Sequence, residues 1–100
     1  MTVGIDVPYE QVAAFCRRWK ISELALFGSV VRGDFGVDSD IDILVTLEPN
    51  APWSMLDRVD MVAELEGIFG REVDLVESSG LRNPFGRHEI LRNKRTVFAA

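Results

Sequence analysis

Apolar residues recur along the chain at two spacings, one typical of helices and the other of strands. Over residues 8–20 they recur every three or four positions, which predicts an amphipathic helix that Pro8 can open. The apolar run 23–27 predicts a strand that stops at Gly28, and a short helix or turn is expected over residues 29–32. The inner side of the first helix is expected to consist of Val12, Phe15, Cys16 and Trp19.

A longer helix is predicted in the middle of the chain. Ser54 and Asp57 have the spacing of a capping box, and Gly70 stands where a helix commonly ends. The helix is therefore expected to continue to about Phe69. Its inner side is expected to consist of Leu56, Val59, Val62, Ala63 and Leu65.

Strands are predicted on both sides of this helix. Residues 40–47 are rich in Ile, Leu, Val and Thr, and residues 71–77, REVDLVE, predict a third strand. After a polar connection, residues 87–93 predict a last short helix and residues 96–99 a terminal strand. Because helices and strands alternate without a repeat or a linker, the pattern indicates one domain, residues 1–100, of the α/β or α+β class with a single sheet.

The composition is typical of a soluble folded protein, with 47% hydrophobic and 27% charged residues. No apolar run approaches the roughly 18 residues of a membrane span, and the first ten residues lack the pattern of a signal peptide. Cys16 is the single cysteine, so it cannot form an internal disulfide, and we expect it to pack in the core. These features predict a cytoplasmic protein with no membrane partner.

The net charge of −5 is unevenly distributed. Residues 81–95 contain five arginines and lysines against one glutamate, and the rest of the chain is strongly acidic. An acidic body argues against direct nucleic-acid binding, which depends on cationic surface, and is compatible with a site for divalent cations. The basic segment is expected either to meet a phosphate or acidic partner or to be a solvated helix face.

Two carboxylates interrupt the most hydrophobic stretch of the chain. Since side chains alternate across a strand, Asp40 and Asp42 share one side of it. The opposite side carries Ile41, Ile43 and Val45, which fix the register by facing the core. Two carboxylates this close repel each other unless a cation lies between them. The pair is therefore expected to bind Mg²⁺ or, alternatively, to be exposed on the outer side of a half-buried strand.

Further features favour the metal site. Gly28 and Ser29 follow a strand, so their backbone N–H groups and the Ser29 hydroxyl could bind phosphate oxygens. Asp74 lies between Val73 and Leu75 in another apolar strand, as a third carboxylate or as an edge-strand charge. A phosphate-binding turn together with three carboxylates provides the groups that metal-assisted phosphoryl or nucleotidyl transfer requires.

The stretch Gly28-Ser29, ten residues, Asp40-Ile41-Asp42 resembles the GS-x10-DxD signature of the DNA polymerase β-like nucleotidyltransferase superfamily. The fuller form, GSVVRGD…SDIDILV, is similar to its small members, the minimal nucleotidyltransferase (MNT) domain proteins. The resemblance extends from about Leu24 to Glu77. It implies a single-domain nucleotidyltransferase fold, a mixed β-sheet flanked by helices.

The resemblance also implies roles for the residues that match. Asp40 and Asp42 would bind Mg²⁺ that bridges the triphosphate of ATP, and Gly28 and Ser29 would contact the phosphates. Asp74, at the place of the family's third carboxylate, would complete a second metal site and help deprotonate the acceptor. Two ions are expected, and the reaction moves AMP from ATP to a hydroxyl with release of pyrophosphate.

Other polar residues carry weaker expectations. Arg32 follows Ser29 by one turn and is either a phosphate contact or a surface charge. Asp34 and Asp38 are expected to form turns rather than bind an ion. His88 is expected to be a surface or core residue rather than a base.

Small MNT proteins are commonly antitoxins encoded beside HEPN-domain toxins, which are RNases, and some attach AMP to a tyrosine of the toxin. The resemblance therefore implies a protein adenylyltransferase that acts as an antitoxin, with a HEPN-type toxin as its partner. Two other hypotheses stay open. One is a non-catalytic module that neutralises its partner by occlusion, and the other is a small-molecule nucleotidyltransferase that works as an oligomer.

Overall fold

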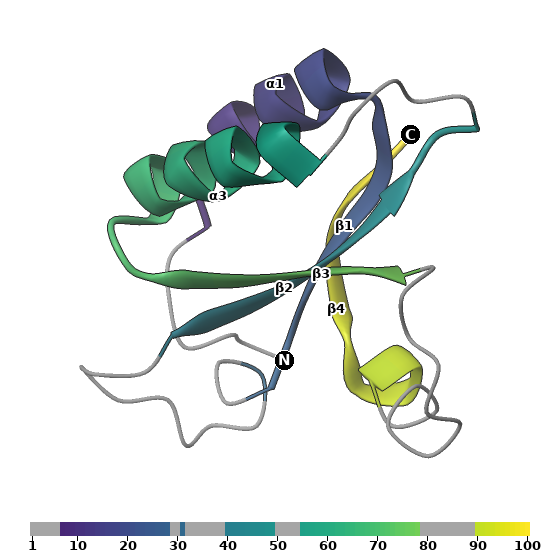
Figure 1. Cartoon of the computed structure of the whole chain (residues 1–100). Coiled ribbons are helices and arrows are strands. Elements are labelled where there is room, and N and C mark those ends of the chain that lie inside the picture. The colour runs from purple at the N-terminus through teal and green to yellow at the C-terminus, as the bar shows by residue number, and fades with distance from the viewer. Residues whose placement is uncertain (1–6, 29–30, 32–39, 50–54, 79–89) are drawn as a thin grey trace.

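The computed structural model describes residues 7–28, 31, 40–49, 55–78 and 90–100. Within these residues the helices and strands follow one another in the order that the sequence predicts (Figure 1). They are the helices α1 (Tyr9–Trp19) and α3 (Met55–Phe69) and the strands β1 (Ile21–Phe27), β2 (Ile41–Leu47), β3 (Val73–Glu77) and β4 (Arg95–Ala99). Residues 90–93 add a helical turn before β4.

The predicted boundaries are confirmed to within two residues at the strands. β1 begins two residues earlier than predicted and β3 two residues later. Of the turn expected over residues 29–32, the structure describes Val31, which is helical. The loop that follows, Ser54 of the expected capping box and residues 87–89 of the last helix lie outside the described residues.

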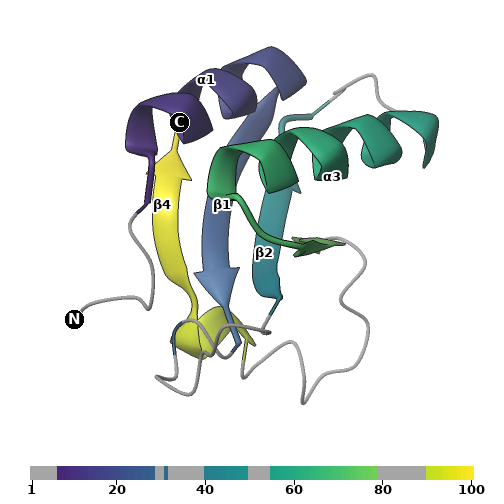
Figure 2. The ribbon, with the colours of Figure 1, turned by 90° about the vertical axis from the view of Figure 1, so that its left-hand side faces the viewer.

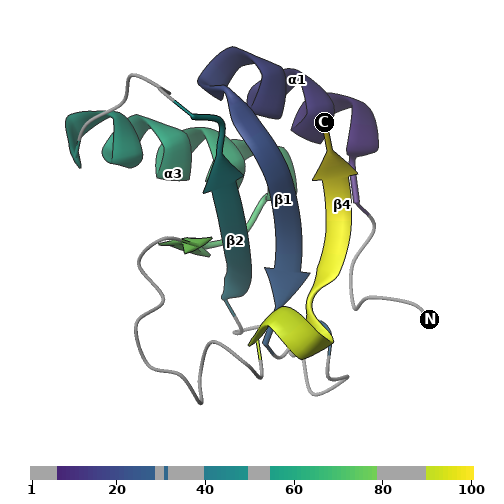
Figure 3. The same cartoon turned by 90° about the vertical axis from the view of Figure 1, so that its right-hand side faces the viewer.

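The four strands form one mixed sheet in the order β3-β2-β1-β4. β1 is antiparallel to both of its neighbours, β2 and β4, whereas β2 and β3 are parallel. A parallel pair needs a crossover connection, and α3 provides it between β2 and β3. The mixed sheet implied by the resemblance is confirmed. Figures 2 and 3 show that α1 and α3 lie on the same face of this sheet, whereas the helical turn at residues 90–93 lies away from them, at the other end of β4.

The hydrophobic core lies between the two helices and the sheet face that they cover. The predicted inner side of α1 is confirmed, because Val12, Phe15 and Cys16 are fully buried and Trp19 packs against them. Burial raises the pKa of the Cys16 thiol to about 12, an effect that the charge of Arg17 offsets only in part. The thiol is therefore a core group, as expected. The sheet contributes Ile21, Leu24, Leu26, Ile41, Ile43, Val45 and Leu75 to this core, and α3 contributes Met61 and Leu65.

The predicted inner side of α3 is wrong at three of its five residues. Leu65 is buried and Val62 packs against the core, but Leu56 is 80% exposed, Val59 is 67% exposed and Ala63 is also exposed. The buried line of the helix instead passes through Met61. The physical reason is that apolar residues occur all round α3, so their spacing does not determine which side faces the sheet.

Both helices end in left-handed residues that close the last turn. Lys20 has a φ of 57° and its N–H donates to the carbonyl of Cys16. Gly70 has a φ of 70° and donates to Glu66 O at 2.8 Å, which confirms the predicted glycine stop of α3. No helix in the described part of the chain is both long enough and apolar enough to cross a membrane.

Candidate functional site

The candidate site lies where β1 ends and β2 and β3 begin. In the register of the sheet, Phe27 is paired with Asp42, and Asp42 is paired with Asp74. Side chains of paired residues lie on the same face of a sheet, and adjacent strands are about 4.8 Å apart. Ile41 and Ile43 are fully buried on the helix-covered face, so Asp42 and Asp74 are on the opposite face. The sheet therefore places two of the three predicted carboxylates side by side.

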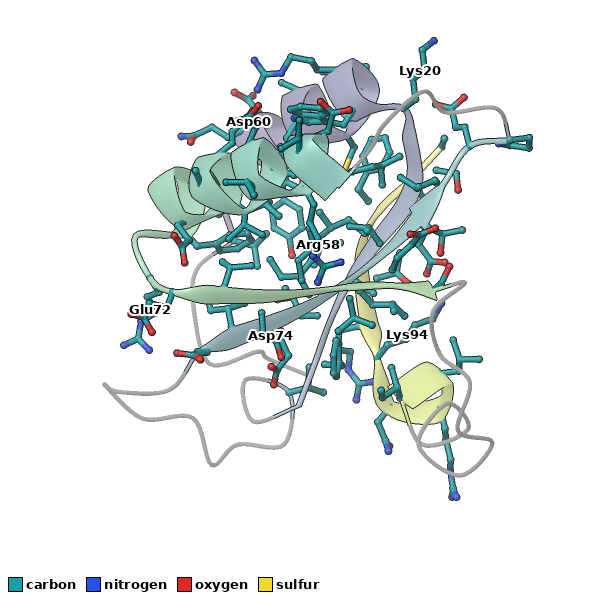
Figure 4. The ribbon with its side chains drawn as sticks, in the orientation of Figure 1. Lys20, Arg58, Asp60, Glu72, Asp74 and Lys94 are labelled. Atoms are coloured by element: carbon teal, nitrogen blue, oxygen red, sulfur yellow. The ribbon has the colours of Figure 1, made fainter. Side chains whose placement is uncertain are left out.

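Asp74 and Asp40 are both exposed, whereas Asp42 is half-buried. Figure 4 shows Asp74 on the side of β3 that faces away from α3. Asp40 comes directly before β2, and the next residue, Ile41, donates its N–H to Glu72 O at 2.9 Å. This bond holds the start of β2 against the start of β3, so all three carboxylates lie near the N-terminal ends of these two strands.

Gly28 brings the end of β1 into contact with the carboxylate of Asp42. A Cβ built on Gly28 would lie 2.1 Å from Asp42 Oδ2, and the φ of Gly28 is +74°. Both facts require glycine, since other residues carry a Cβ and rarely adopt this backbone conformation. The Gly28 carbonyl accepts a hydrogen bond from Val31 N–H at 3.1 Å, which closes a tight turn at the end of the strand. The turn predicted at Gly28 is thus present, and its backbone faces Asp42.

The position of β3 depends on two side chains of α3 that sequence reasoning did not select. Glu66 Oε2 accepts a hydrogen bond from Val73 N–H at 3.1 Å, and Arg58 donates to the carbonyl of Leu75. These bonds hold the residues on either side of Asp74, and Figure 4 shows Arg58 between α3 and β3. No sequence signal marks Arg58 or Glu66, because both look like ordinary surface charges of a helix.

A second polar cluster joins β1 to the C-terminal strand. Glu23 Oε2 accepts hydrogen bonds from Lys94 Nζ at 2.7 Å and from Thr96 Oγ1 at 2.6 Å. The hydrogen bond from Lys94 and, to a smaller extent, the one from Thr96 lower the pKa of Glu23 below its ordinary value. Lys94 of the basic segment is thereby paired within the fold. Most of that segment, with Arg82, Arg87 and His88, lies outside the described residues.

Asp40, Asp42 and Asp74 are suitable ligands for magnesium, but their carboxylates do not converge on one position. Among the residues that the structure describes, no three Asp, Glu, His or Cys side chains lie close enough together to hold a metal ion. The backbone places Asp42 beside Asp74 and Asp40 two residues before Asp42. Hard carboxylate oxygens at one edge suit Mg²⁺, which prefers one or two carboxylates together with phosphate oxygens and water. Ser29 and Arg32, the other predicted nucleotide-binding residues, lie outside the described residues.

Comparison with known proteins identifies the class to which this fold and site belong. The family model of the nucleotidyltransferase domain matches residues 9–97. The chain therefore belongs to the nucleotidyltransferase domain family. Within it, the chain is a minimal nucleotidyltransferase domain protein, homologous to the MntA antitoxins and to protein adenylyltransferases.

Two relatives illustrate the degree of similarity. The protein adenylyltransferase MntA of Thermococcus cleftensis is 42% identical over 66 residues, which cover 66% of this chain and 65% of the relative. A Methanocaldococcus jannaschii protein, provisionally named a protein adenylyltransferase, is 36% identical over 73 residues, 73% of each chain.

Solved structures agree in fold. One provisionally named a minimal nucleotidyltransferase is 37% identical, with a TM-score of 0.71 over 86% of this chain and 85% of its own. A toxin–antitoxin crystal structure with AMP-PNP has a TM-score of 0.75 at 20% identity, covering 94% of this chain and 75% of its own. A Shewanella oneidensis MNT antitoxin, solved with its tri-AMPylated HEPN toxin, has a TM-score of 0.65 at 18% identity, covering 92% and 70%.

Proposed function

We propose that this chain is a protein adenylyltransferase that acts as an antitoxin. It transfers AMP from ATP to a tyrosine hydroxyl of a HEPN-domain partner. The observation that carries the proposal is the alignment of Asp42 with Asp74 beside the Gly28 turn. Support comes from relatives named protein adenylyltransferases, and from fold neighbours crystallised with a toxin and with an ATP analogue.

In this proposal each site residue has one role. Asp40, Asp42 and Asp74 would hold two magnesium ions, and the backbone at Gly28 and Ser29 would bind phosphate oxygens. Bound magnesium supplies charge neutralisation for the triphosphate and lowers the pKa of the acceptor hydroxyl. Arg32 would add a positive charge near the phosphates.

The proposed reaction balances without any further reactant. The acceptor oxygen forms a bond to the α-phosphorus of ATP, and the bond from that phosphorus to the bridging oxygen breaks, so that pyrophosphate leaves. Asp74 accepts the proton of the acceptor hydroxyl. A tyrosine hydroxyl has a pKa of about 10 and is a weak nucleophile at neutral pH, which is why removal of this proton matters.

The test uses ATP labelled at the α-phosphate, the purified chain, Mg²⁺ and the HEPN-domain protein of its pair. Label should appear on the HEPN-domain protein and should be lost with Asp42→Asn. The matched control is Glu48→Gln, which makes the same carboxylate-to-amide change just past the other end of β2, at an exposed residue. Equal labelling by the wild type and Asp42→Asn would overturn the assigned site.

A second candidate function is neutralisation by occlusion, without transfer. The observation in its favour is that the described carboxylates are not gathered into a metal-binding cluster. Under this alternative, Asp42→Asn neutralises the partner as well as the wild type does, and α-label appears on no protein. Label on the partner excludes it.

A further inference from the structure

The outward side of α3 is largely apolar, although nothing in the described chain covers it. Successive helical residues are separated by about 100°, so the exposed residues Leu56, Val59, Asp60, Ala63 and Gly67 share this side, and Asp60 is the charged residue among them. Leu56 and Val59 are 80% and 67% exposed, and Ala63 and Gly67 are exposed as well. A Cβ on Gly67 would meet no atom within 4 Å, so the surface there is open. We call these four residues, Leu56, Val59, Ala63 and Gly67, the α3 stripe.

The neighbouring helix shows that the fold itself does not require such a surface. α1 packs on the same face of the sheet, and most of its exposed residues are charged or polar: Glu10, Gln11, Arg17 and Arg18, beside Tyr9 and Ala14. A surface helix normally carries polar residues on its outer side, and a helix that is apolar all round is normally buried. α3 lies at the surface but has apolar residues on its outer side, as a buried helix does. This combination indicates that another molecule covers it.

The charges around the stripe indicate what kind of molecule this is. α3 carries four acidic residues and one basic residue, Arg58, which donates to the Leu75 carbonyl. Two of the acidic residues, Glu64 and Glu66, are half-buried and also make contacts within the fold. Asp60 is exposed beside the stripe, and Figure 4 shows it on the outer side of α3, away from the sheet. A second copy of this chain would bring its own acidic rim against this one. A surface with a basic rim would meet opposite charge, which favours its approach and its orientation.

We propose that the α3 stripe docks a partner protein through an apolar patch rimmed by lysine and arginine. Resting on the proposed function, the inference names the HEPN-domain toxin as that partner. The stripe and the carboxylates are on opposite sides of the sheet, because α3 covers one face and Asp42 and Asp74 lie on the other. A partner held at α3 therefore does not block the carboxylates, and its acceptor hydroxyl has to reach them on a segment that extends past the sheet.

The test measures affinity for the purified HEPN-domain protein of the pair, by calorimetry without nucleotide. The double variant Leu56→Gln/Val59→Gln should bind at least about tenfold more weakly, because it removes the apolar surface of two large side chains that binding would take out of water. Gln is a good helix former, so the fold is preserved, which circular dichroism checks. The matched control is Tyr9→Gln on α1, another exposed large side chain (60%), which should bind like the wild type.

Two further measurements separate this inference from its alternatives. Asp60→Lys should weaken binding and reduce its salt dependence, since it reverses a charge of the rim. The chain alone should sediment as a monomer; a dimer that Leu56→Gln/Val59→Gln dissociates would overturn the proposal by making the stripe a self-interface. Wild-type affinity in the double variant would also overturn it. Asp42→Asn should bind normally, so a failure of transfer is distinguished from a failure of docking.

Discussion

At the scale of single residues, the site depends on one close approach. The backbone of Gly28 occupies the space beside the Asp42 carboxylate that any side chain would fill. Its left-handed φ adds a second reason for glycine. Gly28 and Asp42 are fourteen residues apart in the sequence (42 − 28), and the fold brings them into contact.

Gly28→Ala should remove AMP transfer and destabilise the protein by about 1–2 kcal/mol or more, because a left-handed alanine is strained and its Cβ collides with Asp42. Urea unfolding and the transfer assay measure the two effects. Gly67→Ala is the comparison, since its Cβ meets open space and should stabilise the helix by roughly 0.5–1 kcal/mol. Equal stability of the two variants would contradict the account.

The stability of the protein should depend on pH through Glu23, whose pKa is lowered by its hydrogen bonds from Lys94 and Thr96. A carboxyl group with a lowered folded-state pKa stabilises the protein above its unfolded-state value, near 4.5, and loses this stabilisation as the pH falls through the folded value. Glu23→Gln should therefore be less stable than the wild type at pH 7, and the difference should shrink below pH ~4. A difference that stays constant between pH 7 and pH 3 would show that ionisation of Glu23 is not involved.

At the scale of elements, α3 determines where β3 lies. Arg58 and Glu66 bind the backbone on either side of Asp74, so the helix fixes the strand that carries the third carboxylate. A second link joins the helices to each other, since Trp19 Nε1 donates to Glu64 Oε1 at 3.2 Å and Arg18 forms an ion pair with Glu64. The exposed side of α3 does none of this work and is available for docking.

Arg58→Met should destabilise the protein by about 1–3 kcal/mol, because it removes a charged hydrogen-bond donor from a half-buried carbonyl. It should also reduce the rate of AMP transfer by displacing β3. Arg18→Met is the matched control: the Arg18 side chain is 62% exposed, and the loss of its ion pair should change stability by less than about 1 kcal/mol. If both variants unfold at the same urea concentration, Arg58 has no special role.

At the scale of the whole molecule, the sequence predicted local features better than those that depend on distant segments. The alternation of Asp42 with Ile41 and Ile43 predicted both faces of β2, and burial confirms it. The pairing of Asp42 with Asp74 could not be derived from spacing, because a parallel register depends on how α3 crosses the sheet. The same limit explains the errors in the predicted inner side of α3. Apolar residues occur all round this helix, so its packing and not its pattern determines which side faces the sheet. The proposed partner accounts for the apolar residues on the outer side.

Taken together, the molecule has two working surfaces on opposite sides of one sheet. One face has the carboxylates beside the Gly28 turn, and the other has α3 with its uncovered stripe. Docking and transfer can therefore be altered independently. This separation predicts that variants of the stripe raise the partner concentration needed for half-maximal transfer, while variants of the carboxylates lower the maximal rate.

The most direct measurement is the intact mass of the HEPN-domain protein after incubation with the chain, ATP and Mg²⁺. The partner should gain the mass of one or more AMP groups with the wild type and with Glu48→Gln, and should gain none with Asp42→Asn or Asp74→Asn. An unchanged partner mass with the wild type, or an AMP-sized gain with Asp42→Asn, would contradict the proposed function.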